Sequence, residues 1–301
     1  RRALGYEIGE PLYNLAVVAD DNFMHITHVV RGEDHISNTA KQILLYKALD
    51  FNLPVFSHTP LILNEDGKKL SKRDSVTSID DFKEMGYLPD ALSNYMALLG
   101  WAPKSNEGEI CSLASIAKSF KLENINKSGA KFNWEKLNWI NSQYIKMMDK
   151  EKLSRIFQKC WEEEGWQILS STWGLKLTEL LQDSITVIKD VVEQSRPFFE
   201  ITEMQKDALE FLENNEVKMS IKYLSEYIDS ENPEINQNSA KEILNFISKE
   251  YGIKKGIIMR SLRVAFFGCL DGPDLIQSWE LFTFNGEDKK RIKRCLEILT
   301  S

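Results

Sequence analysis

The residues best suited to chemistry lie in a basic run, Lys69-Leu70-Ser71-Lys72-Arg73, which follows the turn-forming segment 64–67. A lysine ammonium is a compact charge on a flexible stem, and two of them beside Ser71 could close over a polyphosphate. Such groups stabilise the charge that develops while a phosphorus atom is attacked and pyrophosphate leaves. An ordinary solvated basic turn has the same composition, so this run alone leaves both interpretations open.

A second polar segment, residues 31–39, reads Arg-Gly-Glu-Asp-His-Ile-Ser-Asn-Thr and lies between a strand-like run and a helical pattern. Taken alone, it fits a helix-capping arrangement as well as a ligand site. The four histidines, His25, His28, His35 and His58, all fall within the first 58 residues. Their spacing has no metal-ligand pattern, so we expect no bound metal held by protein ligands.

The elements that must position these segments are strand-like at the start of the chain. Apolar runs predict strands at 15–18 and 23–30, joined by a turn at 20–22, and another strand at 60–63. Helical spacing after residue 36 predicts a helix capped by Ser37, Asn38 or Thr39, with its apolar face formed by Ala40, Ile43, Leu44 and Ala48. The first part therefore reads as strand, polar loop and helix.

From about residue 80 the pattern is mostly helical. Pro89 and Gly100 bound one predicted helix, and Asp149 and Gly165 bound another that places Cys160 in a core. Further amphipathic segments are expected at 175–195, 203–214, 218–229, 239–251 and 273–284. Because no fixed repeat is present, an all-α domain is favoured over a repeat array.

Composition describes an ordinary globular chain of 301 residues, with 43% apolar residues, 28% charged residues and a formal net charge of −7. Its four cysteines have no CxxC spacing, which indicates neither a zinc ribbon nor a disulfide framework. No apolar run approaches the roughly 20 residues that a membrane-spanning helix needs. The acidic balance argues against coating by nucleic acid, although local basic clusters can still bind phosphates.

Together, the two polar segments resemble the signatures of glutamyl-tRNA synthetases, which are class I aminoacyl-tRNA synthetases. Residues 69–73 resemble the KMSKS signature in a KLSKR form, and residues 31–39 resemble the segment RGEDHL-x-NT. Neighbouring segments are similar to the same family: 11–16, 20–21, 56–60, 86–89 and 98–101. The helices after residue 148 resemble the anticodon-binding region of bacterial and organellar members, whereas glutaminyl enzymes carry β-barrels there.

This resemblance implies an α/β, Rossmann-like catalytic core followed by helical regions. Residues 1–65 would form the later part of the core, residues 66–147 the KLSKR loop and stem-contact region, and residues 148–301 an all-α anticodon-binding domain. The HIGH signature of class I enzymes is absent from the sequence, so we expect an N-terminally truncated chain that is inactive alone. The expected location is a bacterial cytoplasm or an organelle matrix, and the expected state is a monomer without membrane contact.

The implied reaction is the ATP-dependent attachment of L-glutamate to tRNA(Glu) through glutamyl-adenylate, with Mg²⁺ accompanying ATP. The resemblance assigns catalysis to Lys69 and Lys72, and ATP binding to Asp34, His35, Lys69, Ser71 and Lys72. It assigns glutamate binding to Tyr13 and Arg31. Tyr13 could instead be a packing residue on a strand, and Arg31 could instead pair with Asp20 or Asp21.

For the tRNA, Ser184 aligns where relatives that reject glutamine tRNA often carry arginine, which hints at additional charging of tRNA(Gln). Trp161, Trp166 and Trp173 are candidates for stacking on anticodon bases. Phosphate contacts could come from basic residues of two clusters, which solvated helix faces explain as well: Lys254, Lys255, Arg260 and Arg263, and Lys289, Lys290, Arg291, Lys293 and Arg294.

Two rival interpretations stay open. A glutaminyl-tRNA synthetase is disfavoured by the helical second half. A tRNA-binding module or synthetase paralogue without ligase activity is disfavoured by the intact KLSKR run.

Overall fold

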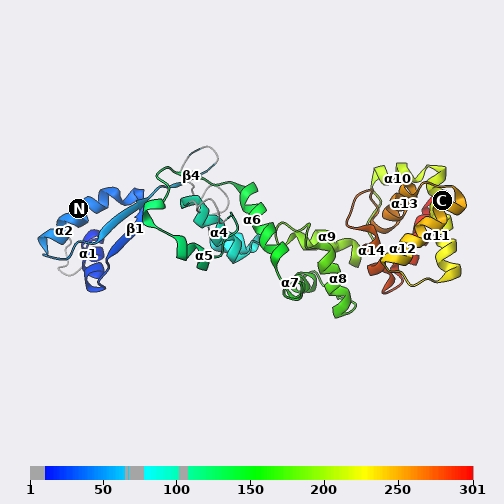
Figure 1. Cartoon of the computed structure of the whole chain (residues 1–301), viewed down its shortest axis with the longest axis horizontal. Helices are drawn as coiled ribbons and strands as arrows, with labels where there is room; N and C mark the ends of the chain where they lie inside the picture. Colours follow the sequence, from blue (N-terminus) through cyan, green and yellow to red (C-terminus); the bar gives the residue numbers. More distant parts are fainter. Residues whose placement is uncertain (1–10, 65–66, 68–77, 102–107, 301) are drawn as a thin grey trace. The chain divides into compact units, whose positions relative to one another are not determined.

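The computed structural model describes residues 11–64, 67, 78–101 and 108–300 (Figure 1). The chain divides into two compact units. Unit 1 comprises Arg1–Glu84 and Leu88–Ile140, and unit 2 comprises Met85–Tyr87 and Asn141–Ser301. The predicted division into three regions, at 65/66 and 147/148, stays a prediction.

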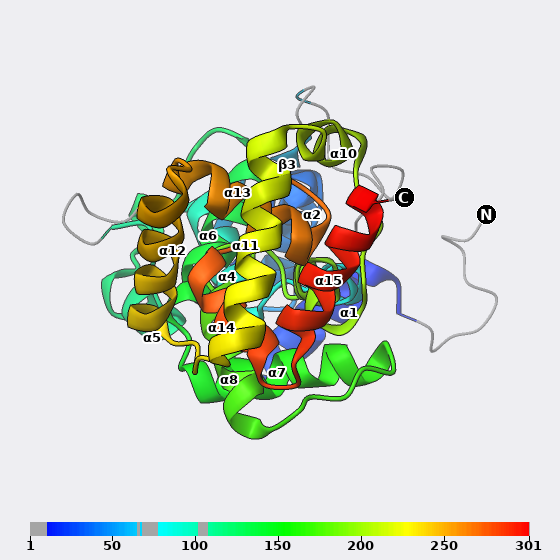
Figure 2. The ribbon, with the colours of Figure 1, turned by 90° about the vertical axis from the view of Figure 1, so that its right-hand side faces the viewer.

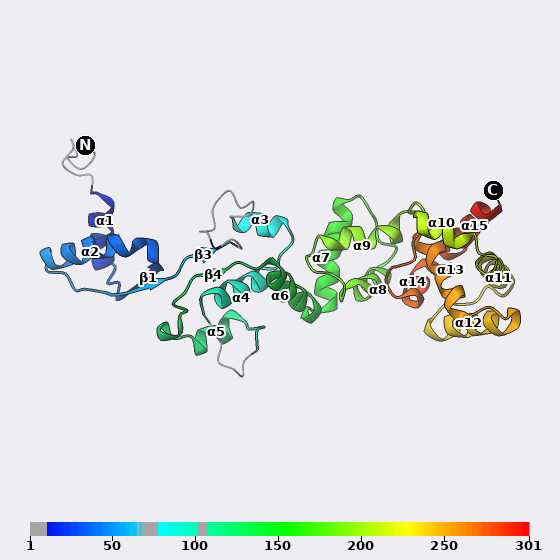
Figure 3. The same cartoon turned by 90° about the horizontal axis from the view of Figure 1, so that it is seen from above.

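Unit 1 contains two parallel strands, β1 (His28–Gly32) and β2 (Val55–Thr59), with Arg31 opposite His58. The chain leaves β1 through the short 3₁₀ helix η2 (Glu33–His35) and returns to β2 by way of α2 (Ile36–Ala48). Parallel strands need such a crossover because the carboxyl end of one strand and the amino end of the next lie at opposite ends of the sheet. A further helix, α1 (Tyr13–Phe23), packs beside α2 (Figure 3).

The strand predicted at 15–18 and the turn predicted at 20–22 were wrong, because both segments lie within α1. A short apolar run does not distinguish a strand from a helix, and Val18 alone of the residues in α1 is buried. The chain reverses after α1 at His25, whose φ of 55° is left-handed. The strand therefore begins at His28 and not at residue 23.

The helix predicted after residue 36 is confirmed as α2, but its cap and its buried face were wrong. His35 precedes the helix, and no side chain caps its first amides. The buried residues are Thr39, Gln42 and Tyr46, while Leu44 is 67% exposed. Polar side chains can occupy a buried face when they have hydrogen-bond partners there, and Thr39 and Gln42 both have them.

The rest of unit 1 packs around aromatic side chains. Its elements are β3 (Ile62–Leu63), α3 (Ile79–Glu84), α4 (Pro89–Gly100), α5 (Leu113–Ser119), η3 (Leu122–Asn124) and β4 (Ala130–Lys131), followed by the start of α6 (Trp134–Met147). β3 pairs with β4 in parallel. The rings of Phe82, Tyr95 and Trp134 all contact Phe132, so these aromatic side chains form one packed cluster.

Unit 2 is helical. Its helices are α7 (Lys150–Glu163), α8 (Ser171–Leu181), α9 (Asp190–Phe199), α10 (Lys206–Leu212), α11 (Asn215–Glu231), α12 (Gln237–Tyr251), α13 (Lys255–Phe267), α14 (Leu275–Thr283) and α15 (Glu287–Thr300). Figure 2 shows α11 beside α15. The predicted cap at Asp149 is confirmed, since its carboxylate accepts a hydrogen bond from the amide of Lys152.

The amphipathic segment expected over 175–195 contains parts of two helices in the structure, α8 and α9. After α8 ends, the carboxylate of Asp190 accepts hydrogen bonds from the amides of Thr186 and Val187 and begins α9. The Nε2 group of Gln182 donates to three carbonyl oxygens at the end of α6, those of Ile145, Lys146 and Met148. This amide satisfies carbonyl groups that a helix end otherwise leaves without partners.

Two buried contacts join α8 and α9 to α14. The indole Nε1 of Trp173 donates to the carbonyl oxygen of Leu281 at 3.1 Å, and the ring of Phe198 stacks on Phe282 with centroids 5.0 Å apart. Unit 2 thus has a continuous core across these helices. In the part of the chain that the structure describes, no helix has the length and apolarity to cross a bilayer.

Candidate active site

A network of polar side chains gathers around the carboxyl ends of β1 and β2. Arg31 and Gly32 end β1, and His58 and Thr59 end β2. In open sheets of parallel strands, ligands bind in the crevice beyond these ends. The segment singled out by its residue types, 31–39, therefore lies where the architecture would place a ligand.

Arg31 is held by neutral partners. Its Nη2 donates to Thr39 Oγ1 at 2.5 Å and to Gln42 Oε1 at 2.7 Å, and its guanidinium lies 5.5 Å from the centre of the Phe56 ring. Its buried Nε has no hydrogen-bond partner. Within the described residues no carboxylate forms an ion pair with Arg31, so the alternative pairing with Asp20 or Asp21 is wrong. Its positive charge is oriented without being neutralised.

Thr39 connects Arg31 to two histidines. Its hydroxyl donates to the carbonyl oxygen of His35 at 3.1 Å and lies 2.9 Å from His58 Nε2. A hydroxyl has one hydrogen to donate and two lone pairs, so Arg31 and His58 both donate to Thr39. This assignment places a proton on His58 Nε2.

Tyr13 and His35 lie side by side at the rim of this network. Their ring centres are 6.3 Å apart, and Tyr13 is 53% exposed. Tyr13 begins α1, so the expectation that it lies on a strand was wrong. His35 Nδ1 lies 3.2 Å from the side-chain amide of Asn38, which orients the imidazole.

Asp34 lies in η2, with its carboxylate close to the backbone of Gly32. A Cβ atom at position 32 would lie 2.5 Å from Asp34 Oδ1, so a larger residue there would require this carboxylate to shift. The remaining predicted site residues, Lys69, Ser71 and Lys72, lie outside the described residues.

Sequence reasoning missed the side chains that orient Arg31, above all Gln42 and Asn14. Gln42 donates to Asn14 Oδ1 at 3.1 Å while it accepts from Arg31. A signal was present, because Thr39, Gln42 and Tyr46 recur at helical spacing and place two hydrogen-bonding groups on one face. The prediction instead placed the apolar residues of this helix on its buried face.

In unit 2, Ser184 is exposed just after α8. Its hydroxyl donates to the carbonyl oxygen of Leu181 and contacts Gln194 Oε1, while Gln194 Nε2 donates to the Ser184 carbonyl oxygen at 3.2 Å. Ser184 is therefore accessible and held by contacts with Leu181 and Gln194. It does not belong to the network around Arg31.

The tryptophans proposed for stacking on anticodon bases are packing residues. Trp161 and Trp173 are buried and donate their indole hydrogens to Ser195 and Leu281. Trp166 stacks on Phe199 with centroids 4.9 Å apart. These partners leave no free face on the two buried rings for a base.

Several of the basic residues proposed as phosphate contacts have intramolecular partners. Arg291 is buried and donates to the carbonyl oxygens of Phe266 and Glu200, so its interpretation as a phosphate contact was wrong. Arg263 donates to the carbonyl oxygen of Gly272, and Lys293 pairs with Asp229. Burial lowers the pKa of Arg291, although Glu287 raises it. These cations stabilise the helical unit.

The described residues contain no group of three or more histidine, cysteine, aspartate or glutamate side chains arranged to hold a metal ion. Magnesium keeps several waters and commonly binds through substrate phosphates together with one or two carboxylates. A magnesium ion brought by a nucleotide is compatible with this arrangement.

Comparisons with known proteins agree in both halves of the chain. Residues 4–139 match the catalytic domain of class I tRNA synthetases (E and Q), and residues 135–296 match an anticodon binding domain. A glutamate--tRNA ligase of Prochlorococcus marinus subsp. pastoris is 66% identical over 98% of the chain, and one from strain NATL1A is 48% identical over 98%. Each match covers 62% of the relative, so the chain spans about three fifths of its length.

Solved structures show the same similarity. The crystal structure of a glutamate tRNA ligase from Elizabethkingia meningosepticum in complex with its amino acid has a TM-score of 0.88 and 32% identity, over 96% of this chain and 60% of that one. The enzyme of Elizabethkingia anophelis has a TM-score of 0.85 and 32% identity, over 95% and 60% of the two chains. The predicted fold class, a synthetase catalytic core followed by a helical anticodon-binding region, is confirmed.

Proposed function

This chain belongs to the glutamyl-tRNA synthetase family, and from that premise we propose that its protein attaches L-glutamate to tRNA(Glu) with ATP. The supporting observation is the charge of Arg31, which two neutral side chains orient and no described carboxylate neutralises. The glutaminyl alternative has no comparable support, because the similar curated proteins are glutamate--tRNA ligases.

Glutamate binding is assigned to Arg31 and Tyr13. An arginine guanidinium favours carboxylates, and its hydrogen bonds to Thr39 and Gln42 fix its direction before the substrate arrives. Tyr13 presents an exposed hydroxyl at the rim, 6.3 Å from His35 between ring centres. A site that supplies both a cation and a hydroxyl would reject substrates that lack the matching groups.

ATP binding is assigned to Asp34, His35, Lys69, Ser71 and Lys72. The α-carboxylate of glutamate would attack the α-phosphorus, pyrophosphate would leave, and the product would be glutamyl-adenylate. Lys69 and Lys72 would stabilise the charge on the phosphoryl oxygens. Mg²⁺ would accompany ATP and would share that charge.

In the second step a ribose hydroxyl of the terminal adenosine of tRNA would attack the glutamyl carbonyl carbon, and AMP would leave. No covalent enzyme intermediate is required. Unit 2 would hold the anticodon arm, with Ser184 as a contact that admits both tRNA(Glu) and tRNA(Gln). We propose a monomer, and residues 1–301 alone should be inactive because they lack the HIGH motif.

The experiment is aminoacylation by the complete gene product, with radiolabelled glutamate and purified tRNA(Glu) and tRNA(Gln). Lys72→Ala should reduce kcat by orders of magnitude because it removes charge stabilisation from the first step. Arg31→Ala should mainly raise the KM for glutamate. Tight tRNA binding without charging of either tRNA would eliminate the ligase and leave the tRNA-binding module.

A further inference from the structure

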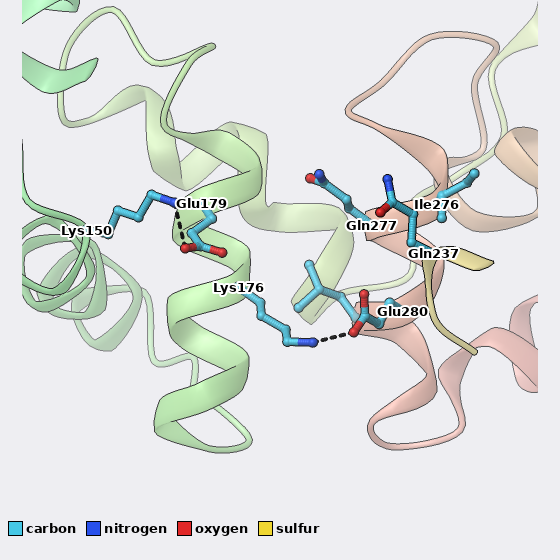
Figure 4. Close-up of a pocket in the computed structure, with 8 residues that line it drawn as sticks. Lys150, Lys176, Glu179, Gln237, Ile276, Gln277 and Glu280 are labelled. Carbon is cyan, nitrogen blue, oxygen red and sulfur yellow. Dashed lines mark hydrogen bonds and ion pairs between the residues drawn. The ribbon is translucent and has the colours of Figure 1, made fainter. Parts of the chain in front are cut away.

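A groove in unit 2 separates α8 from α14, and the first residues of α7 and α12 line its rim (Figure 4). The groove has a volume of about 320 Å³. Its polar lining consists of Lys150, Lys176, Glu179, Gln237, Gln277 and Glu280. All of them fall in the segment that matches the anticodon-binding family, so RNA is the expected class of ligand.

Both lysines of the groove are held in ion pairs. Lys150 Nζ lies 2.8 Å from Glu179 Oε1, and Lys176 Nζ pairs closely with Glu280 Oε1. The four charges sum to zero, so the groove offers little net attraction to phosphate. The side chains stay partly exposed, so each pair contributes a modest free energy, which a phosphate must overcome before it can bind the lysine.

Gln237 and Gln277 differ from the charged residues, because neither carboxamide hydrogen-bonds to any other side chain or backbone group of the described residues. Ile276 and Leu281 add apolar surface beside them. A carboxamide carries a donor and an acceptor in one plane, which suits the edge of a base. Unstacked bases of single-stranded RNA are recognised along such edges.

We infer that this groove receives an unstacked nucleotide of the tRNA, and that Glu179 and Glu280 mask its lysines against the phosphates of other RNAs. The inference rests on the proposed function. In the cognate complex the carboxamides meet the base while both ion pairs stay closed. An RNA without the matching base could gain affinity only through phosphate contacts with the two lysines. The carboxylates of Glu179 and Glu280 compete with those phosphates.

The Lys176–Glu280 pair also separates two spaces. The same two residues line a neighbouring cavity of about 450 Å³ with Asn232, Thr283 and Phe284, and Lys176 Nζ lies 5.8 Å from the centre of the Phe284 ring. Opening the pair would connect the groove with this cavity. A closed pair therefore limits how far an RNA chain can extend along α14.

The test compares Glu280→Gln and Lys176→Gln in the complete gene product. Glu226→Gln is the matched control, because it also removes one negative charge and releases a lysine, Lys222, from an exposed pair on α11. The probes are tRNA(Glu) and an unrelated tRNA, and their Kd values are measured by filter binding between about 50 and 200 mM salt.

Glu280→Gln should tighten binding of the unrelated tRNA about three- to tenfold at low salt, because Lys176 becomes available to a phosphate. The plot of log Kd against log salt should steepen by roughly 0.7 to 0.9 for one added phosphate contact. Binding of tRNA(Glu) should change by less than about twofold, so discrimination falls. Lys176→Gln should alter neither Kd by more than about twofold, since a masked lysine contributes little.

Two results would overturn the inference: an Lys176→Gln protein that binds tRNA(Glu) at least about tenfold more weakly, or a Glu280→Gln protein that behaves like Glu226→Gln. Thermal unfolding reports whether each variant folds. If Glu280→Gln does not fold, the test is repeated with Glu179→Gln, which releases Lys150. Aminoacylation by the wild-type protein is measured in parallel. If the wild-type protein does not aminoacylate tRNA, the proposed function is wrong. If it does, but the variants bind both tRNAs with wild-type Kd values, only the masking of the lysines is wrong.

Discussion

Arg31 carries a positive charge that its surroundings orient and leave unbalanced. Its partners Thr39 and Gln42 are neutral, and burial of a cation without an opposite charge costs free energy that a bound anion can recover. Such an arrangement would favour a carboxylate ligand, as proposed for glutamate. Charge at this one guanidinium should therefore control affinity for glutamate.

Gln42→Glu tests that control without changing the shape of the side chain. The new carboxylate would lie where Gln42 Oε1 now lies, 2.7 Å from Arg31 Nη2, and would neutralise the guanidinium. The KM for glutamate should rise about tenfold or more, while the KM for ATP changes by less than about threefold. Steady-state aminoacylation kinetics measure both values.

Asn14→Ala is the matched control for Gln42→Glu. It removes the hydrogen bond from Gln42 Nε2 to Asn14, which the glutamate variant also loses, but it adds no charge. Its KM for glutamate should rise by less than about threefold. Equal effects of the two substitutions would show that geometry and not charge determines the affinity.

Cys295 provides a pH dependence of stability. Burial raises the pKa of its thiol to about 12, from an unfolded value near 9. Between these two pKa values the folded state keeps the thiol proton, whereas the unfolded state releases it. The contribution of Cys295 to the free energy of unfolding is therefore fully present below about pH 8.5 and decreases as the pH rises. The slope is at most about 1.4 kcal/mol per pH unit for this one group.

A Cys295→Ala protein lacks this thiol but has the same other titratable groups as the wild type. The difference in unfolding free energy between wild type and variant should shrink by about 1 to 2 kcal/mol between about pH 8 and pH 10. Urea denaturation at a series of pH values measures it. Parallel pH profiles would contradict the raised pKa.

At the scale of elements, prediction succeeded where local signals agreed with each other. Asp149 caps α7 and Pro89 begins α4, because both residues act on the first turn of a helix through their own chemistry. The segment 15–18 failed, since four apolar residues fit a strand and a helix equally. The break between α8 and α9 was not predicted, because it depends on contacts of Asp190 with the loop amides of Thr186 and Val187 that only the fold reveals.

The ends of α12 and α13 offer a matched pair of glycines. Gly252 and Gly268 follow these helices with φ values of 69° and 68°. A Cβ at Gly252 would meet nothing within 4 Å, whereas a Cβ at Gly268 would lie 2.7 Å from the carbonyl oxygen of Glu203. Backbone strain is common to both positions, and the clash is specific to Gly268.

Gly252→Ala should therefore reduce the free energy of unfolding by about 1 kcal/mol, the cost of a left-handed alanine. Gly268→Ala should reduce it by about 3 kcal/mol, because the segment before α10 must also move. Urea denaturation with matched m-values measures the difference. Equal losses of unfolding free energy in the two variants would mean that the 200–205 segment moves without an energetic penalty.

For the whole molecule, resemblance to the family located the candidate site better than physical patterns did. The polar loop 31–35 was found by its sequence, but the network that orients it depends on Asn14, Gln42 and His58, which the fold gathers from separate elements. The same limit applied to charge. The sequence displays Arg291 and Lys293 as a basic cluster, and only folding reveals their intramolecular partners.

The choice between tRNA(Glu) and tRNA(Gln) would be made by unit 2. Ser184 is exposed and holds Gln194 through reciprocal contacts, so it presents a short neutral surface. Ser184→Arg would replace that surface with a long cation that carries five fixed donors and demands matching acceptors from the RNA.

With Ser184→Arg in the complete gene product, kcat/KM for tRNA(Gln) should fall at least about tenfold, while kcat/KM for tRNA(Glu) changes by less than about threefold. Aminoacylation with each purified tRNA measures both values. Gln194→Ala is the control, because it removes the partner of Ser184 without adding charge and should affect both tRNAs alike. A wild-type protein that already rejects tRNA(Gln) would contradict dual specificity, and equal losses on both tRNAs would assign Ser184 a structural role.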